Sequence, residues 1–384
     1  MYQVLSLLRD EGPMSRTELA DRLDLSRPRL GVEIGRMTAA GKVRQTGPAP
    51  SHGGRRPALI ELDPHIRFAA IDLGLTSIDV EITDGSLRPV ASYSEPADAA
   101  RGPRPMLTRV DEILASFKTD GVYERLSAIG IGMPARVRVH GGLPISPSLP
   151  VWDRYPLCES LGRQHGCPVA VDEGVRVMAI GERHAGVEGP VDNQLFVKID
   201  TDIGCGIHVG GEVYRGPDGR AGDIGHIQVD PHGPVCSCGN TGCLAAVLSS
   251  LTAKDIARGA AEGDLTSINL IREGARRLGT VLAMLVNFLN PSMIVIGGGV
   301  AGLGTLMLAE IRGAVYRRSS PLATGNLPVV LSQLGPRAGV VGAAVLASEV
   351  AFGAPMVMQR PTPSGRSVPW NVDVVWGCAD AVRS

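Results

Sequence analysis

Residues 221–244 read AGDIGHIQVDPHGPVCSCGNTGCL and are the most informative stretch of this 384-residue chain. They contain the pattern His226-x9-Cys236-x-Cys238-x4-Cys243. Three thiolates and one imidazole complete the tetrahedral shell of Zn²⁺ and leave no position open, so the pattern predicts one structural zinc site per chain. The alternative is a chance cluster of cysteines beside an unrelated histidine. The chain has seven cysteines, and this odd number favours metal binding in a reducing cytoplasm over a disulfide framework.

Short apolar runs alternate with helical stretches on both sides of this pattern. The runs at residues 68–76 and 78–82 are expected to form a hairpin. Further strand-like runs lie at residues 129–132, 169–172, 195–199 and 293–296. Such alternation is typical of an α/β body in which helices pack on sheets.

The first 66 residues have a different pattern, which predicts three short helices followed by a hairpin. Ser15 and Glu18 form a capping box at the start of the second helix, and Ser26 is a suitable N-cap for the third. The strands of the hairpin are expected at residues 42–46 and 58–62. Three helices and a hairpin are the elements of a winged helix-turn-helix domain.

The charge of the chain is balanced overall but not within this first segment. With 38 basic and 39 acidic residues the net charge is −1, so no global field attracts nucleic acid. From residue 27 to residue 56, however, seven basic residues accompany one acidic residue. This local excess predicts contacts with double-stranded DNA by Ser26, Arg27, Arg29, Arg55 and Arg56. The alternative is a protein-interaction domain with a solvated basic face.

The sequence gives no indication of a membrane or secreted protein. No apolar run approaches the roughly 20 residues needed to cross a bilayer, and the N-terminus lacks the basic and apolar regions of a secretion signal. We therefore expect a cytoplasmic protein with no membrane partner.

Together these stretches resemble the ROK family of repressors, open reading frames and kinases, and the first domain resembles the winged helix of its repressor branch. The matching segments are Ser26-Arg-Pro28, Gly54-Arg-Arg-Pro57, Pro156-Leu157, Gly181-Glu182, Ala221-Gly-Asp-Ile-Gly-His226, Cys236-Ser-Cys-Gly-Asn-Thr-Gly-Cys-Leu244 and Ile296-Gly-Gly-Gly299. The resemblance implies a two-lobed, ribonuclease H-like body related to actin and hexokinase, with sugar bound between the lobes. The expected units are a DNA-binding domain at residues 1–66, a sugar-kinase-like sensor at 67–350 and a proline-rich tail at 351–384.

The residues that the resemblance assigns to phosphoryl transfer are largely replaced. Active ROK kinases carry an Asp base in an Asn-Asp-Ala-Asn segment, and here Gly174 takes the place of that base, with Glu173 at the first Asn. The phosphate-binding hairpins have changed to Asp72-Leu-Gly-Leu-Thr76 and Asp200-Thr-Asp-Ile-Gly204. Because an added aspartate repels a nucleotide phosphate, we expect neither ATP binding nor enzyme activity. A one-residue slip that makes Glu173 the base would instead give an atypical ATP-dependent sugar kinase.

The sugar pocket implied by the resemblance is only partly preserved. Asp223 replaces the usual Glu, His226 is kept, and Ala245 replaces a second Glu. A zinc-bound histidine can still meet a sugar hydroxyl with its other ring nitrogen. The expected ligand-binding residues are therefore Glu173, Arg176, Asp223 and His226, and Arg176 suits an anionic ligand such as a sugar phosphate. A degenerate pocket that binds nothing is the alternative.

These features predict a transcriptional regulator, a repressor, with a zinc-stiffened sensor body that has lost catalysis. A homodimer, or a dimer of dimers, on a palindromic operator would double the base contacts of one small domain. The alternatives are the atypical sugar kinase and a DNA-bound scaffold that recruits another protein without an effector.

Overall fold

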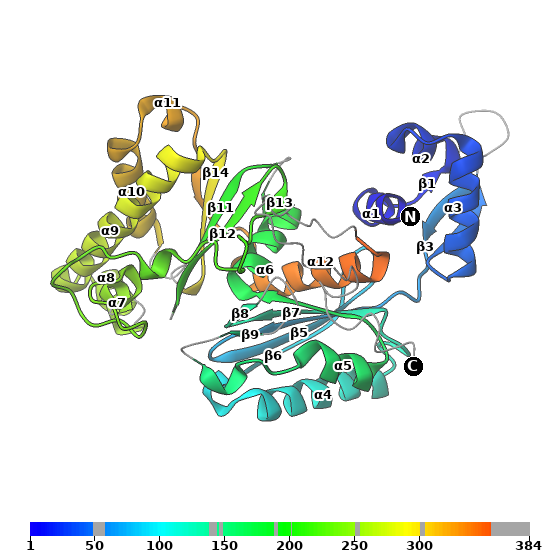
Figure 1. Cartoon of the computed structure of the whole chain (residues 1–384), viewed down its shortest axis with the longest axis horizontal. Coiled ribbons are helices and arrows are strands. Elements are labelled where there is room, and N and C mark those ends of the chain that lie inside the picture. The colour runs from blue at the N-terminus through cyan, green and yellow to red at the C-terminus, as the bar shows by residue number, and fades with distance from the viewer. Residues whose placement is uncertain are drawn as a thin grey trace, which may run out of the picture.

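The computed structural model describes residues 1–48, 58–137, 144–145, 149–187, 191–200, 202–249, 254–299 and 304–354. Within these ranges the chain forms a small N-terminal unit and two lobes, each built on a five-stranded sheet (Figure 1). The mixed α/β architecture expected from the sequence is therefore confirmed. No helix in the described part of the chain is long and apolar enough to cross a membrane.

The N-terminal unit consists of three helices and a three-stranded antiparallel sheet of order β1-β3-β2. Its elements are α1 (Tyr2–Glu11), β1 (Met14–Ser15), α2 (Arg16–Leu23), α3 (Arg27–Ala39), β2 (Val43–Pro48) and β3 (Ala58–Leu62). The predicted capping box is present: Ser15 Oγ accepts from the Glu18 N–H at 3.2 Å, and Glu18 Oε2 accepts from the Ser15 N–H at 2.7 Å. Ser26 precedes α3 but makes no capping bond through its side chain. The short strand β1 was not predicted, because two residues carry no periodic signal.

The first lobe has a mixed sheet of order β10-β7-β4-β5-β6. Its strands are β4 (Phe68–Leu73), β5 (Ser77–Thr83), β6 (Pro89–Pro96), β7 (Ala128–Met133) and β10 (Val169–Glu173). The predicted hairpin is β4 and β5, whereas β7 and β10 run parallel to β4. One face packs on α4 (Pro103–Thr119) and α5 (Leu157–His165), and the other packs on α6 (Gly174–Gly181) and α12 (Ala338–Phe352) (Figure 1). The short strands β8 (Arg136–Val137) and β9 (Pro144–Ile145) pair with each other beside this sheet.

The second lobe has a sheet of order β13-β12-β11-β14-β15. Its strands are β11 (Gln194–Ile199), β12 (Ile203–Val209), β13 (Glu212–Val213), β14 (Met293–Gly297) and β15 (Val329–Leu331). Its helices are α7 (Leu244–Leu248), α8 (Lys254–Ala261), α9 (Leu265–Leu289), α10 (Gly304–Arg318) and α11 (Pro321–Thr324). Two short helical turns lie between these elements: η3 (Glu182–Gly186) follows α6, and η4 (Ile224–His226) lies between β13 and α7.

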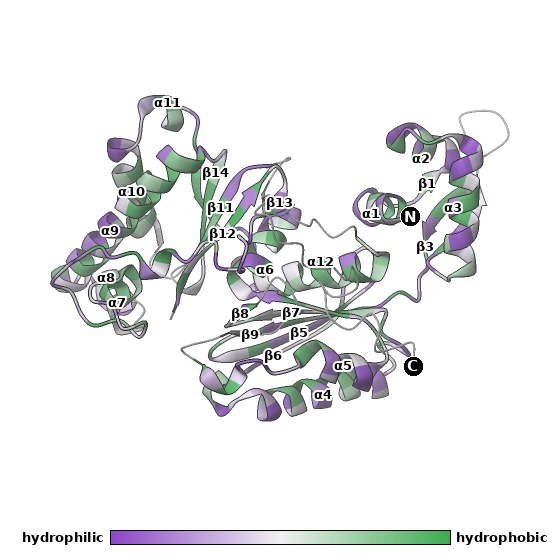
Figure 2. Cartoon of the chain, viewed as in Figure 1, coloured by the Kyte–Doolittle hydropathy of each residue, from purple (hydrophilic) through white to green (hydrophobic). Residues whose placement is uncertain are grey.

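Helix α12 lies at the centre of the molecule and packs against α6 and the first sheet. It is drawn mostly in green and white, whereas α3 and α4 alternate between green and purple (Figure 2). The backbones of α12 and α6 are in direct contact at Gly342. A Cβ at this position would lie only 1.8 Å from the Val177 carbonyl oxygen, so the contact requires glycine. This contact fixes the helix that carries part of the candidate site.

The C-terminal end of α12 also holds the N-terminal unit. Arg9 Nη1 on α1 donates to Ser348 Oγ at 2.6 Å, and Lys42 Nζ donates to the Ala351 carbonyl at 2.7 Å. Beside these contacts Phe68 and Phe352 stack edge to face with ring centroids 5.8 Å apart. One hydrophobic cluster runs from the N-terminal helices into this contact; it includes Val4, Leu5, Leu8, Leu62, Ile66, Phe68, Ala347 and Phe352. The N-terminal unit is thus docked on the body through a shared core.

Candidate functional site

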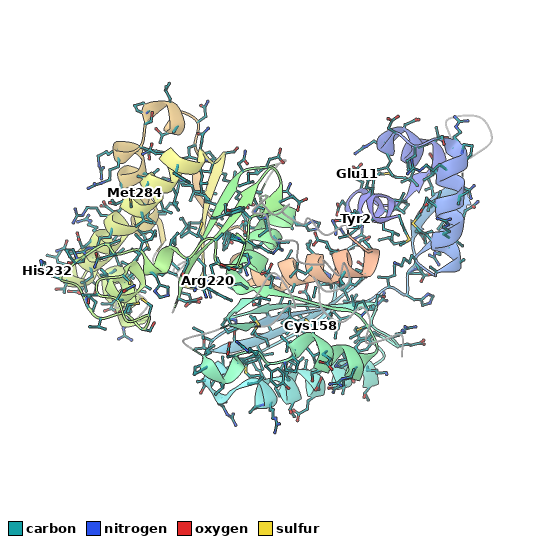
Figure 3. All side chains as sticks on the ribbon, viewed as in Figure 1. Tyr2, Glu11, Cys158, Arg220, His232 and Met284 are labelled. Carbon is teal, nitrogen blue, oxygen red and sulfur yellow. The ribbon has the colours of Figure 1, made fainter. Side chains whose placement is uncertain are left out.

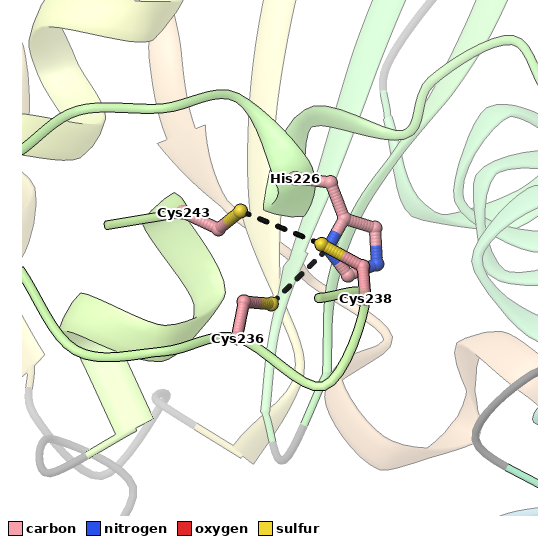
Figure 4. A group of neighbouring side chains, drawn as sticks. All are labelled: His226, Cys236, Cys238 and Cys243. Atoms are coloured by element: carbon pink, nitrogen blue, oxygen red, sulfur yellow. Dashed lines mark hydrogen bonds between the residues drawn. The ribbon is translucent and has the colours of Figure 1, made fainter. Parts of the chain in front are cut away.

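The predicted metal ligands come together in the second lobe, between η4 and the start of α7. The ligand atoms of His226, Cys236, Cys238 and Cys243 all lie within 4.8 Å of one another (Figure 4). His226 Nδ1 is 3.4 Å from Cys236 Sγ, and Cys238 Sγ is 3.6 Å from Cys243 Sγ. A tetrahedron with metal–sulfur bonds of ~2.3 Å has edges of about 3.8 Å, so this cluster has the dimensions that a zinc ion requires. The sequence pattern therefore describes a real cluster, and the four side chains could hold one metal ion.

The loop that presents the cysteines is fixed at both ends. Cys243 directly precedes α7, and a bridge pairs it with Gln228. Gly242 adopts a φ of +68°, and a Cβ there would lie 1.5 Å from the Asp230 carbonyl oxygen, so only glycine fits. Asp230 in turn accepts from Arg277 Nη1 on α9 at 2.9 Å. In Figure 3, His232 marks the outer end of this loop and Met284 marks the neighbouring helix α9.

A second cluster, of charged residues, lies where β10 ends and α6 begins. Asp172 Oδ1 accepts from Arg176 Nε at 2.6 Å, and Asp172 Oδ2 accepts from Arg215 Nε at 2.9 Å. Arg176 Nη1 is also 2.7 Å from Glu173 Oε2 and donates to the Gly219 carbonyl at 3.1 Å. Figure 3 shows that Arg220, the next residue, lies near the junction of the two lobes. Arg176 is fully buried, and two carboxylates neutralise its charge.

Burial and the neighbouring arginines shift the pKa values of Asp172 and Glu173 in opposite directions. Burial on its own would raise the pKa of Asp172, but Arg176 and Arg215 outweigh it and hold that pKa below its usual range. For Glu173 burial is the larger effect and raises the pKa, although Arg176 and Arg136 oppose it. Asp172 is therefore the permanent anion of this cluster.

The other two expected ligand-binding residues reach this cluster from the second lobe. His226 directs Nδ1 to the cysteines and Nε2 to Asp223 Oδ1, 3.9 Å away. Asp223 forms an ion pair with Arg136 of β8, and both Arg136 and Asp223 act electrostatically on Glu173. The structure therefore brings Glu173, Arg176, Asp223 and His226 into one region.

Three residues of this region were missed in the sequence, namely Arg136, Asp172 and Arg215. Asp172 had a detectable signal, because it lies four residues before Arg176 across a helix start. Arg215 and Arg136 had none, since their acidic partners come from distant segments. That Arg176 serves an anionic ligand stays a prediction: two carboxylates bind its Nε and Nη1, while its buried Nη2 has no hydrogen-bond partner among the described residues.

The expected nucleotide-binding segments line a different cavity between the lobes, with a volume of about 200 Å³. Its lining includes Asp72, Gly174, Lys198, Asp200 and Gly299. Lys198 Nζ is 2.6 Å from Asp202 Oδ1, and a Cβ at Gly299 would lie 3.0 Å from Asp200 Oδ1. Burial raises the pKa of Asp72 to about 7, although Lys198 opposes this. Three aspartates, Asp72, Asp79 and Asp200, thus line this cavity together with Lys198.

Gly174 is the residue that the family resemblance places at the position of the catalytic base. Gly174 lines the cavity and has no side chain to accept a proton. The neighbouring Glu173 carboxylate is instead bound to Arg176. No residue at these two positions presents a free carboxylate to the 200 Å³ cavity.

The expected DNA-contacting residues at the start of α3 are exposed. Ser26, Arg27 and Arg29 are open to solvent, while Leu30 and Ile34 of the same helix are buried against the N-terminal core. Neither Arg27 nor Arg29 forms an ion pair within the described part of the chain, so their charge is available to a partner. Arg55 and Arg56 lie outside the described residues.

Comparisons with known proteins agree with this arrangement. The ROK family profile matches residues 68–350. A xylose repressor of Caldicellulosiruptor bescii is 27% identical over 370 residues, covering 88% of this chain and 92% of the repressor. A glucokinase of Thermotoga maritima is 26% identical over 315 residues, covering 74% of this chain and 98% of the kinase. The crystal structure of a ROK family transcriptional regulator, a homologue of the E. coli MLC protein, has the same fold, with a TM-score of 0.77, 24% identity and coverage of 91% of this chain and 95% of that one.

Proposed function

Because the chain belongs to the ROK family, we propose that it is a DNA-binding transcriptional regulator, a repressor, whose sugar-kinase-like body has lost catalysis. The observation that carries this proposal is the N-terminal unit. The match to a repressor spans 88% of the chain, whereas the match to a glucokinase spans 74% and already covers 98% of that enzyme. The additional segment of this chain is thus the part that a kinase does not need.

The N-terminal unit acts as a winged helix-turn-helix domain. Helix α3 enters the major groove with its first turn, where Ser26, Arg27 and Arg29 are exposed. The two arginines contact phosphates or guanine edges. Arg55 and Arg56, between the two wing strands, remain sequence-based predictions of minor-groove contacts. A homodimer places two such domains on a palindromic operator.

Binding of the purified full-length protein to genomic fragments tests this function. We expect selected fragments to be bound in preference to bulk DNA at about 0.15 M salt. Arg29→Ala should weaken the selected site by about 1–3 kcal/mol and bulk DNA by less. Arg163→Ala, in an exposed pair with Glu159 at 3.3 Å on α5, is the matched control and should change neither. A protein that prefers no fragment would refute the proposal.

The body acts as a sensor and not as a kinase. Gly174 cannot take a proton from a sugar hydroxyl, and Asp200, which lines the cavity between the lobes, and the neighbouring Asp202 repel a nucleotide. Calorimetry with Mg-ATP and a coupled assay over hexoses, hexosamines and pentoses test this. Turnover of roughly 1–100 s⁻¹ would instead establish a sugar kinase, the second candidate, which the glucokinase relative favours.

The His226 cluster holds one structural Zn²⁺ per chain. All four ligands come from the protein, so the ion adds no open coordination position and fixes the loop next to Asp223. The effector is a sugar or sugar derivative that binds between the lobes beside His226. Regulation requires that this ligand bind the DNA-competent form and the released form with different affinities.

A further inference from the structure

The two acidic side chains of the proposed sugar pocket are already occupied by arginines of the same chain. Asp223 is paired with Arg136, and Glu173 is 2.7 Å from Arg176. Sugar hydroxyl groups donate most strongly to carboxylates, and these two carboxylates are the acceptors that the pocket would offer. A sugar that takes either carboxylate as its acceptor must therefore compete with a guanidinium.

The two arginines differ in how easily they can leave. Arg176 is fully buried and held by Asp172, Glu173 and the Gly219 carbonyl. The Arg136 side chain is 25% exposed, and Asp223, which is 29% exposed, is its one ion-pair partner among the described residues. Arg136 can turn into solvent, whereas the departure of Arg176 would leave a buried charge unpaired.

The position of Arg136 also joins the two lobes. It follows β7 of the first lobe on the short strand β8, while Asp223 immediately precedes η4 of the second lobe. Its ion pair with Asp223 therefore links the two lobes. Asp223 Oδ1 is also 3.9 Å from His226 Nε2, so the Arg136–Asp223 ion pair lies beside the predicted metal ligands.

We propose that Arg136 is a built-in occupant of the sugar pocket, which holds the lobes together in place of a ligand and excludes neutral monosaccharides. This inference rests on the proposed sensor function of the same site. A neutral sugar offers hydroxyl groups to Asp223 but no positive charge to replace the displaced guanidinium. The free energy needed to break the Arg136–Asp223 ion pair thus determines which ligands can bind.

The test compares sugar binding by the intact, metal-loaded protein and its variants. D-glucose, D-xylose and N-acetylglucosamine are titrated by calorimetry into the wild type, Arg136→Ala and Arg136→Gln. Arg163→Ala serves as the matched control, because that arginine also forms an ion pair but lies on the outer helix α5. We expect at least one sugar to bind both Arg136 variants about tenfold or more tightly than the wild type, and the control to match the wild type.

Equal affinities in the wild type and both variants, or no binding by any of them, would overturn the proposal. Loss of the fold in both variants, measured by circular dichroism and metal content, would overturn it as well, because Arg136 would then be a structural residue and not a displaceable occupant. DNA binding is measured on the same samples. Specific DNA binding without a gain in sugar affinity refutes this inference alone, and a gain in sugar affinity without specific DNA binding refutes the proposed function alone.

Discussion

Replacing Asp172 by Asn should destabilise the body of the protein. The carboxylate accepts three hydrogen bonds: from Arg176 Nε at 2.6 Å, from Arg215 Nε at 2.9 Å and from the Glu173 N–H at 2.8 Å. Asparagine keeps the shape but loses the charge, and its amide group would direct its own N–H donors at one of the arginines. The perturbation is therefore electrostatic.

The size of the loss follows from what remains for each arginine. Removing one partner of a buried ion pair costs about 3–5 kcal/mol. Arg176 keeps Glu173 and the Gly219 carbonyl, and Arg215, whose side chain is 24% exposed, can be partly solvated. The lower end of the range applies, so we expect a loss of about 3 kcal/mol, or about a hundredfold in the unfolding equilibrium.

Urea unfolding followed by circular dichroism measures this loss at pH 7. The pKa of Asp172 lies below its usual range in the folded protein, so its stabilising effect is present above the pKa of the unfolded chain, near 3.8, and is lost as the pH falls below it. The difference between wild type and Asp172→Asn should therefore be constant from pH 6 to 8. Asp153→Asn is the control, since Asp153 is 47% exposed and 3.9 Å from Arg154. A loss below about 1 kcal/mol for Asp172→Asn would refute the reasoning.

Three further predictions concern the metal, a buried histidine and a helix contact. Cys238→Ser should lower the metal content measured by elemental analysis from one Zn²⁺ per chain and reduce the melting temperature, and a metal-free protein of unchanged stability would contradict the zinc site. Burial, aided by Arg183 and Arg215, lowers the pKa of His208 to about 4. Below pH 6.5 the unfolded chain therefore takes up a proton that the folded chain does not, so stability should fall by up to about 2 kcal/mol from pH 7 to pH 5. His208→Asn should remove that share of the pH slope, and an identical slope in the variant would contradict the assignment. Gly342→Ala should cost about 3 kcal/mol or more despite the better helix propensity of alanine, because the new Cβ would lie 1.8 Å from the Val177 carbonyl oxygen. Its control is Gly35→Ala in α3, where nothing lies within 4 Å of the added Cβ and the change should be neutral or stabilising in thermal melts.

Features encoded within a few residues could be predicted from the sequence. The capping box of Ser15 and Glu18, the hairpin of β4 and β5 and the clustering of His226 with three cysteines all follow from local spacing. The two-lobed body was inferred from the family resemblance, and the sheets confirm its mixed α/β class. The loss of the catalytic base at Gly174 stays a prediction from the family resemblance.

The charge pairing within the site could not be predicted in the same way. Arg215 lies 43 residues from Asp172, and Arg136 meets Asp223 only after both lobes have formed. The sequence assigned Arg176 to an anionic ligand, and its spacing did not indicate that the fold would also give its guanidinium two carboxylates. The long-range pairing of charges depends on tertiary geometry, which residue spacing does not contain.

The docking of the N-terminal unit on α12 has a consequence for the operator. A DNA-binding domain on a flexible tether tolerates half-sites at many separations, because the tether adjusts its length. Here Val4, Leu62 and Phe352 belong to one hydrophobic core, and Arg9 and Lys42 bond directly to the last turns of α12. In the proposed dimer the bodies would therefore fix both the separation and the relative rotation of the two α3 helices. Inserting half a helical turn, about 5 base pairs, between the half-sites should then abolish binding, whereas a tethered domain would follow the change.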